Sequence, residues 1–291
     1  MNTIHMNQLE KGTGLYEYTL DYIHSVWGSR NRNVFPGPHP VSIERVHIPH
    51  IHTHRYMVCE KTDGVRYLLV CLVFESKKYG ILVNRAMEMY TICAALPKDT
   101  LLDGELIGTT FIAHDSLRVN GTRTAHLPLN ERLEWASVAT RGPPCGGVRL
   151  KVKKMVPLCE FQKLYDDTKN DPHIDGYIFT PIDEPIRMET HETLFKWKPM
   201  KHITIDFIVQ GNKLHIWDSR HGFVFIQNSP VEKPDGTILE CKREEHNGWV
   251  FVKERPDKVH PNNRRTYIRT LHNIKENIQP EEFLMKRAIS G

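Results

Sequence analysis

The chain has 291 residues, with 39 Lys and Arg against 35 Asp and Glu, which gives a formal net charge of +4 at pH 7. Its hydrophobic content of 40% and charged content of 25% are ordinary for a globular protein and exclude a disordered chain. The longest apolar run, 67–74, is far shorter than the roughly 20 residues that a membrane-spanning helix needs, so we expect no membrane partner. Residues 1–12 are polar and lack the apolar core of a signal peptide. We therefore expect a soluble protein of one large or two ordinary domains.

The six cysteines include no Cys-x-x-Cys pair, which disfavours a zinc site or a redox pair. Several of them lie inside apolar runs, as reduced core cysteines do. This usage indicates a reducing, intracellular compartment.

Hydrophobic periodicity predicts an amphipathic helix over 15–27, and an apolar run predicts a buried strand over 65–74. Further strands are expected at 80–84, 101–108, 174–180, 203–209, 213–217, 222–228 and 248–253. Helices are expected at 129–139 and 160–166, and again after residue 266 with a break at Pro280. The pattern becomes nearly all-β after 199–202, so we place a domain boundary near residue 201.

The most informative segment is Cys-Glu-Lys-Thr-Asp-Gly-Val-Arg at 59–66, in which Lys61 precedes the first buried strand. A lysine amine is a nucleophile only when it is neutral, and desolvation or nearby cations favour that form. Arg66 is close in sequence, and Lys196 and Lys198 would add positive charge if they fold nearby. The segment alone fits either a nucleophile or a solvated lysine in a surface turn.

Acidic residues stand at the start of two other apolar strands. Asp103 and Glu105 are two residues apart, so their side chains share one strand face. Such a pair can hold Mg²⁺ or Mn²⁺ and a ribose hydroxyl, although solvated acids at a strand edge would look the same. Asp175 opens the strand expected at 174–180 and could serve the same metal.

Two groups of cations suit phosphate binding. Lys196 and Lys198 share one strand face and are backed by aromatic residues on the other, although the same pattern fits lysines in water. Arg255 and Lys258, with Asp257 between them, directly follow the last expected strand. They could grip a pyrophosphate or form an ordinary basic turn.

Two further tracts have simpler explanations. Histidines at 47, 50, 52 and 54 could bind a transition metal if the chain is extended, but we expect a polar strand face leading to Lys61. Lysines at 151, 153 and 154 predict a solvated basic face, with contact to RNA phosphates as the alternative.

Taken together and in order, these elements resemble the motifs of covalent nucleotidyltransferases, namely mRNA capping enzymes and ATP-dependent polynucleotide ligases. The matching segments are 61–66, 103–105, 111–115 with 119–121, 175–181, 194–199, and Trp249 with 255–258 and 261–262. Segments 35–37 and 40–42 resemble the stretch that precedes the nucleophile in capping enzymes. The resemblance covers about residues 15–265, and its detail favours the capping branch.

The resemblance implies an α+β fold. A nucleotidyltransferase domain of the ligase and capping type, unlike ATP-grasp, would cover 1–201. An OB-fold β-barrel lid would cover 202–265, which suits the short strands expected there. A helical segment over 266–291 would pack back on the first domain.

The resemblance also implies an activity, that of an mRNA guanylyltransferase. GMP would pass from GTP, through a covalent lysyl-GMP on Lys61, to the 5′-diphosphate end of RNA to form the GpppN cap. There are two alternatives, an ATP-dependent polynucleotide ligase that forms lysyl-AMP and an inactive RNA-binding relative.

Site roles follow from the same resemblance. Lys196 and Lys198 would contact the α-phosphate, while Arg255, Asp257 and Lys258 would orient the leaving pyrophosphate. Six residues would bind the nucleotide, namely Arg66, Glu105, His114, Lys196, Lys198 and Lys258. Asp103, Glu105 and Asp175 would hold Mg²⁺ or Mn²⁺. His114 departs from the family, which usually has an aromatic residue at this place, so base selection there is in question.

The other steps of capping have no visible motif. There is no His-Cys-x₅-Arg phosphatase motif and no glycine-rich methyltransferase module, so a separate RNA triphosphatase and cap methyltransferase are expected partners, together with RNA polymerase. The compact form resembles small stand-alone viral guanylyltransferases. The expected location is therefore the nucleus or, for a viral protein, a cytoplasmic virus factory.

Overall fold

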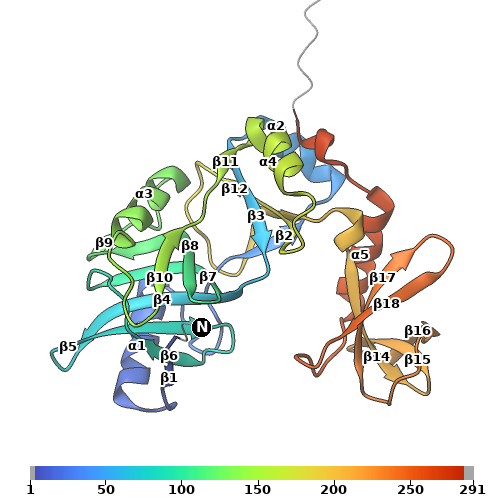
Figure 1. The fold of residues 1–291 in the computed structure, drawn as a ribbon, viewed down its shortest axis with the longest axis horizontal. Coiled ribbons are helices and arrows are strands. Elements are labelled where there is room, and N and C mark those ends of the chain that lie inside the picture. Colours follow the sequence, from blue (N-terminus) through green and yellow to red (C-terminus); the bar gives the residue numbers. More distant parts are fainter. Residues whose placement is uncertain (1–3, 285–291) are drawn as a thin grey trace, which may run out of the picture. The chain divides into compact units, whose positions relative to one another are not determined.

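The computed structural model describes residues 4–284 (Figure 1). The chain divides into two compact units. Within the described residues, the first unit comprises 4–41 and 50–196, and the second comprises 42–49 and 197–284. None of the described helices combines the length and apolar character that crossing a membrane would require.

The larger sheet of the first unit has eight strands in the order β1-β6-β5-β4-β7-β8-β10, with β9 paired to β8. The strands are β1 (Asn7–Gln8), β4 (Val65–Phe74), β5 (Lys77–Asn84), β6 (Met89–Ile92), β7 (Thr100–Ile107), β8 (Thr110–Val119), β9 (Thr122–Arg123) and β10 (Arg149–Val152). Neighbouring strands are antiparallel, except that β10 runs parallel to β8.

Both faces of this sheet are covered, which explains why β4 is apolar along most of its length. Val70 and its even-numbered neighbours pack in the cluster that contains helix α1 (Gly14–Trp27). Leu69 and the odd-numbered residues pack in the cluster that contains helix α3 (Leu129–Ala139). Because side chains alternate along a strand, the two helices cover opposite faces (Figure 1).

The smaller sheet of the first unit has five strands in the order β11-β3-β12-β13-β2. They are β2 (His39–Ser42), β3 (Tyr56–Thr62), β11 (Val156–Pro157), β12 (Ile174–Pro181) and β13 (Thr190–Trp197). Helix α4 (Phe161–Thr168) packs against β12, since the Phe161 ring lies 5.3 Å from that of Tyr177 and 5.2 Å from that of Phe179.

The histidine tract is helical, so the strand expected there is wrong. A 3₁₀ turn over Arg45–His47 leads into helix α2 (Ile48–Thr53). The rings of His50 and His54 stack with their centroids 3.8 Å apart. Residues four apart are neighbours along a helix, whereas they would be well separated along a strand.

The second unit contains a five-stranded antiparallel sheet in the order β16-β15-β14-β17-β18. Its strands are β14 (Thr204–Gln210), β15 (Lys213–Asp218), β16 (Gly222–Asn228), β17 (Ile238–Glu244) and β18 (Gly248–Glu254). The Gln227 side chain on β16 accepts the Trp249 N–H of β18 at 2.9 Å and donates to its carbonyl at 2.7 Å. This amide links the two outer strands, but across residues 4–284 no backbone pairing closes the sheet, and the OB barrel stays a prediction.

Helix α5 (Arg264–Glu276) packs on this sheet through Tyr267, Leu271 and Ile274. The Asn273 side chain also donates to the Ile43 carbonyl at 2.7 Å, which holds the 42–49 segment in the second unit. A 3₁₀ turn at Pro280–Phe283 follows. The predicted contact of 266–291 with the first domain stays a prediction, and its last seven residues lie outside the described residues.

Cys93 and Cys145 form a disulfide, so the expectation of reduced cysteines is wrong for these two. The glycine-rich loop 141–147 passes close to Cys93, since a Cβ on Gly146 would lie 2.6 Å from the Cys93 Cβ. That approach joins residues separated by 52 positions. The cysteines at 59, 71 and 241 are free and buried, and Cys159 is free and exposed.

Candidate active site

The candidate site lies where the chain passes from the smaller to the larger sheet of the first unit. Lys61 is near the end of β3, and Arg66 is near the start of β4, with the turn 63–64 between these strands. A cavity of about 200 Å³ opens there and is lined by residues of both sheets. The predicted residues in its lining are Lys61, Arg66, Asp103, Glu105 and His114.

Lys61 is held by a carboxylate from the neighbouring strand. Its Nζ donates to Asp175 Oδ2 at 2.6 Å, and both side chains are about two-thirds buried. The contact follows from strand register, because Lys61 pairs with Gly176 of β12. The pairing brings together two residues that are 114 positions apart in the sequence and that were predicted to share one site.

Two motif glycines are required by close approach. A Cβ on Gly64 would lie 2.8 Å from the Ile107 side chain and 2.9 Å from Glu105 Oε2. A Cβ on Gly104 would lie 2.6 Å from the Phe111 ring. Any larger residue would therefore push the β3–β4 turn away from Glu105 or displace β8 from β7.

Arg66 and Asp103 form a two-point ion pair in the cavity wall. Arg66 Nε lies 3.0 Å from Asp103 Oδ1, and Nη2 lies 2.6 Å from Oδ2. The remaining Nη1 donates to the Pro38 carbonyl at 2.5 Å, and the guanidinium lies 5.3 Å from the centre of the Phe35 ring. Both Asp103 oxygens are thus engaged by Arg66, which fixes the guanidinium in the cavity wall.

Glu105 is the most heavily engaged carboxylate of the site. It accepts a hydrogen bond from the Thr62 hydroxyl, lies 3.3 Å from Lys153 Nζ and lies 3.6 Å from His114 Nε2. Burial alone would raise the pKa of Glu105, but His114, Thr62 and Lys153 outweigh it and lower the pKa to about 2. Glu105 therefore ionises more readily than an ordinary glutamate.

Lys153 belongs to the site, so the solvated face predicted for it is wrong. Its side chain is only 7% exposed, and Nζ donates to Thr62 Oγ1 at 2.8 Å. Its backbone N–H donates to the Ala113 carbonyl at 2.7 Å, directly after β10. Lys151 and Lys154 are exposed, as predicted. Lys153 and Lys154 both lie beyond the end of β10, and no local signal says which of the two is buried.

Arg85 is a second cation that sequence reasoning missed. It lines the same cavity. Burial lowers the pKa of Arg85, and the nearby Arg66 charge lowers it further, while Asp103 acts in the opposite direction. The cavity wall therefore carries more positive charge than the motifs indicate.

Asp115, the acid of the third motif, is tied to a helix rather than to solvent. Arg132 of α3 donates to both of its oxygens, at 2.7 and 3.0 Å. Arg132 is 2% exposed, and its Nη1 also donates to the carbonyls of Leu127 and Glu184, at 2.6 and 2.8 Å. Burial raises the pKa of Asp115 even though the Arg132 charge lowers it. The pair anchors β8 beneath His114.

The two motif lysines at the end of β13 are both half-buried. Lys196 lies two residues after Leu194, which lines the cavity, so alternation places both on one strand face. Lys198 lies just beyond the end of β13 and groups with the second unit. Their contacts with a nucleotide stay predictions.

The basic cluster of the second unit is organised by Asp206, which the sequence analysis did not single out. Arg255 lies 2.7 Å from Asp257 Oδ2 and 3.2 Å from Asp206 Oδ1. Lys258 also forms an ion pair with Asp206, which is only 5% exposed. The hydrogen bond to Asp257 raises the pKa of Arg255 and lowers that of Asp257 to about 2. Three predicted residues are thus brought together around one buried acid.

The predicted metal ligands are not gathered into one cluster. No group of three His, Cys, Asp or Glu side chains placed to hold a metal ion is found within residues 4–284. The physical reason is that each carboxylate faces a cation, namely Arg66 for Asp103, Lys153 for Glu105 and Lys61 for Asp175. By its donor chemistry, the site fits a metal held by one or two carboxylates together with phosphate oxygens.

Comparisons with known proteins identify the family. The family model described as mRNA capping enzyme, catalytic domain, matches residues 17–200, and that for the C-terminal domain matches 184–284. The chain belongs to the mRNA capping enzyme family. This confirms the predicted family and an enzyme of the capping branch over the ligase alternative.

Individual relatives agree. The chain is 26% identical to an mRNA-capping enzyme subunit alpha of Schizosaccharomyces pombe, over 88% of this chain and 81% of the relative. It is 25% identical to an mRNA-capping enzyme of Caenorhabditis elegans, over 81% of this chain and 46% of the relative. Among solved structures, a mycobacterial DNA ligase D complexed with ATP and MES matches with a TM-score of 0.46 and 14% identity, over 77% of this chain and 96% of the ligase chain.

Proposed function

We propose that this capping enzyme is an mRNA guanylyltransferase whose nucleophile is Lys61. The observation that carries the proposal is the placement of the Lys61 amine at the lining of the first-unit cavity, 2.6 Å from Asp175. An amine that lines a cavity together with the cations Arg66 and Arg85 is placed to attack a bound phosphate once it loses its proton.

In the first step, the nitrogen lone pair of Lys61 attacks the α-phosphorus of GTP. The N–P bond forms as the bond from that phosphorus to the bridging oxygen breaks, and the electron pair leaves with pyrophosphate. The ammonium gives up one proton to expose that lone pair and a second as the N–P bond forms, and Asp175, hydrogen-bonded to Nζ, is placed to relay both to solvent.

In the second step, a terminal oxygen of the RNA 5′-diphosphate attacks the phosphorus of lysyl-GMP. The new P–O bond completes the GpppN cap as the N–P bond breaks, and Nζ recovers its electron pair and a proton. A second proton, taken up through the same carboxylate, restores the Lys61 ammonium and its ion pair with Asp175.

The surrounding residues bind and orient the nucleotide. Arg66, fixed by Asp103, and Arg85 offer cations to phosphates or ribose at the cavity wall. His114 offers an imidazole face for the base, and Lys196 would reach the α-phosphate. The roles of Lys198, Arg255, Asp257 and Lys258 on the phosphates are part of the same proposal.

A divalent cation, Mg²⁺ or Mn²⁺, fits the donor set of this site. Glu105 and Asp175 would hold it together with phosphate oxygens, whereas both oxygens of Asp103 are engaged by Arg66. When bound, the cation would supply charge neutralisation at the reacting phosphate.

The wider context is also proposed. The S. pombe relative is a subunit alpha by name, which supports a partner chain for the RNA triphosphatase step. A cap methyltransferase and RNA polymerase are further proposed partners. We propose a nuclear location or, for a viral protein, a cytoplasmic virus factory.

The decisive experiment measures the covalent intermediate. The protein is incubated with Mg²⁺ or Mn²⁺ and either α-labelled GTP or α-labelled ATP, then separated by denaturing electrophoresis. We expect label from GTP that is absent in Lys61→Met and present in Lys78→Met, an exposed lysine outside the cavity.

Transfer to RNA is then tested by adding 5′-diphosphate RNA to the labelled protein, which should release the label as a nuclease-resistant cap. Label from ATP alone would instead indicate a ligase. Folded protein that forms no adduct with either nucleotide would contradict both enzymes.

A further inference from the structure

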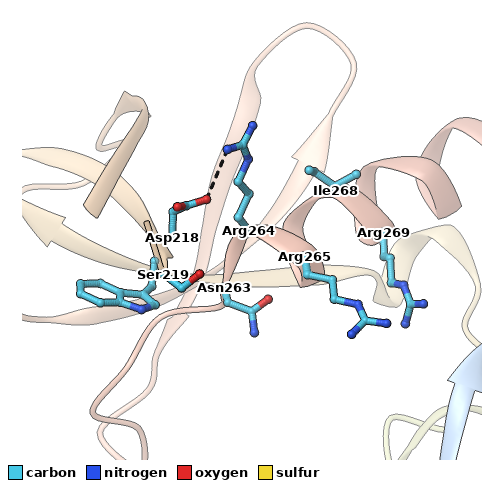
Figure 2. A pocket seen from close by; sticks show the side chains of 8 residues that line it. Asp218, Ser219, Asn263, Arg264, Arg265, Ile268 and Arg269 are labelled. Carbon is cyan, nitrogen blue, oxygen red and sulfur yellow. Dashed lines mark hydrogen bonds and ion pairs between the residues drawn. The ribbon is translucent and has the colours of Figure 1, made fainter. Parts of the chain in front are cut away.

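A second cavity, of about 700 Å³, lies within the second unit (Figure 2). One wall is the end of β15, from Trp217 to Ser219, and the other is the start of α5, from Asn263 to Arg269. The Trp217 N–H donates to the Asn262 carbonyl at 3.1 Å and joins the walls. We propose that this groove binds the single-stranded RNA that follows the 5′-diphosphate end, an occupant that rests on the proposed function.

The positive charge of the groove exceeds what the fold neutralises. Arg264 lies 3.3 Å from Asp218, which also accepts the backbone N–H groups of Arg220 and His221. Figure 2 shows Arg264 directed to Asp218, while Arg265 and Arg269 extend together on the other side. Throughout the described part of the chain, neither Arg265 nor Arg269 forms an ion pair with an acid.

These two arginines do not stabilise the helix that carries them. Like charges four residues apart on a helix repel each other, and the first turn of α5 contains no acid to offset them. A polyanion with regularly spaced phosphates would remove that repulsion, and its binding would release counterions.

Aromatic rings continue the groove along the solvent face of β15 and β16. Trp217 is 43% exposed, and its ring contacts that of Phe223, itself 42% exposed, at 5.1 Å. Phe225 is 52% exposed and contacts His215 at 6.0 Å. The residues that alternate with these on β15, Leu214 and Ile216, are buried in the core. Exposed rings in a row indicate a binding surface.

Cations beside exposed rings favour a nucleic acid over an acidic peptide. Bases stack on aromatic faces whatever their identity, and arginine and lysine track the phosphates. Lys213 adds one more cation, 5.6 Å from the centre of the Phe225 ring. A phosphorylated peptide would use the arginines but would leave the aromatic row without a partner. Single-stranded RNA uses both.

The test measures binding of a short 3′-labelled 5′-diphosphate oligoribonucleotide to the full chain by fluorescence anisotropy over a range of salt concentrations. The double variant Arg265→Ala/Arg269→Ala should raise Kd about tenfold and reduce the slope of log Kd against log salt by about 1.4, at about 0.7 per phosphate contact. Trp217→Ala should raise Kd about tenfold and leave that slope unchanged.

The matched control is Lys78→Ala/Arg123→Ala, which removes two exposed cations from the first unit and should change Kd less than about twofold. All variants should form lysyl-GMP from GTP alone as the wild type does, which also shows that they are folded. The arginine variant should change the salt dependence of Kd, whereas the Trp217 variant should not. A general loss of structure would not produce this difference.

Unchanged RNA affinity in the arginine and Trp217 variants would overturn the proposal. A loss of RNA affinity in these variants that is no larger than the loss in the control would also overturn it. So would variants that keep RNA binding but lose binding to a multiply phosphorylated serine peptide. Failure of the proposed function is separate, because it appears as missing lysyl-GMP in the wild type. The RNA measurements would then still decide whether the groove binds RNA.

Discussion

The ammonium group of Lys153 lies 3.3 Å from the carboxylate of Glu105, in a site where both side chains are less than a tenth exposed. The Thr62 hydroxyl accepts from Lys153 at 2.8 Å and donates to Glu105. Lys153 follows β10, and Glu105 lies on β7, so the contact links strands on either side of β8. Through Thr62, this hydrogen-bond network reaches the residue next to Lys61.

Removing Lys153 should destabilise the protein and disturb the site. In Lys153→Met, Glu105 keeps its charge in a buried place without its cation, which costs about 3–5 kcal/mol. We expect a lower free energy of unfolding, measured in urea. In the protein that remains folded, we expect the rate of lysyl-GMP formation to fall by roughly 10-fold or more, because neighbouring groups are misplaced. Lys151→Met, on the exposed side of β10, is the control. Equal behaviour of the two variants would contradict a site role for Lys153.

Glu105 should give the protein an acid-dependent stability. Its folded pKa of about 2 is below its ordinary value of 4.5, so its ionised form stabilises the fold above pH 4.5. This stabilisation is lost as the pH falls from 4.5 towards 2. The gap in unfolding free energy between wild type and Glu105→Gln should therefore be full at pH 7 and shrink below pH 4.5.

Urea denaturation at pH 7, 5, 4 and 3 measures this gap. Glu134→Gln, in an exposed position of α3, is the matched control and should show little difference from wild type at any pH. A gap that is constant across these pH values would contradict the lowered pKa of Glu105.

Asp175 should matter for chemistry more than for folding. Asp175→Asn keeps the shape but removes the charge that faces Lys61 Nζ at 2.6 Å. Because a nucleophile that is misplaced by about 1 Å can lose about 100-fold in rate, we expect lysyl-GMP formation to fall by roughly that factor. Single-turnover labelling with GTP measures it, with Asp167→Asn on the exposed side of α4 as control. A rate within a factor of two of wild type would exclude a role for Asp175 in the first step.

The Arg132–Asp115 pair should be a large contributor to the stability of the first unit. Arg132→Met leaves Asp115 buried and unpaired, with a loss of about 3–5 kcal/mol of unfolding free energy. Adding Asp115→Leu should recover part of that loss, since both charges are then gone, although the carbonyls of Leu127 and Glu184 still lack their donor. Thermal and urea denaturation measure both. The control is Arg149→Met, and a loss no larger than that of the control would contradict the finding.

Much of the fold could be predicted from local pattern. The apolar run at 65–74 and the helix expected at 129–139 correspond to β4 and α3, because a strand that is covered on both faces reads as a continuous apolar run. Lys61, Arg66 and Glu105 were singled out by motif spacing, and the structure places all three at one cavity.

The tertiary structure alone decided which charges meet. Lys153, Arg85 and Asp206 carry no motif, and a buried lysine looks like a solvated one in a list of residues. Their positions depend on strand pairings between distant segments, such as β10 with β8, which hydrophobic period does not encode. The sequence by itself determined most of the elements and the family, and it proposed the nucleophile. Long-range packing determined the partners of each charge, because the electrostatic environment of a side chain depends on its neighbours in space.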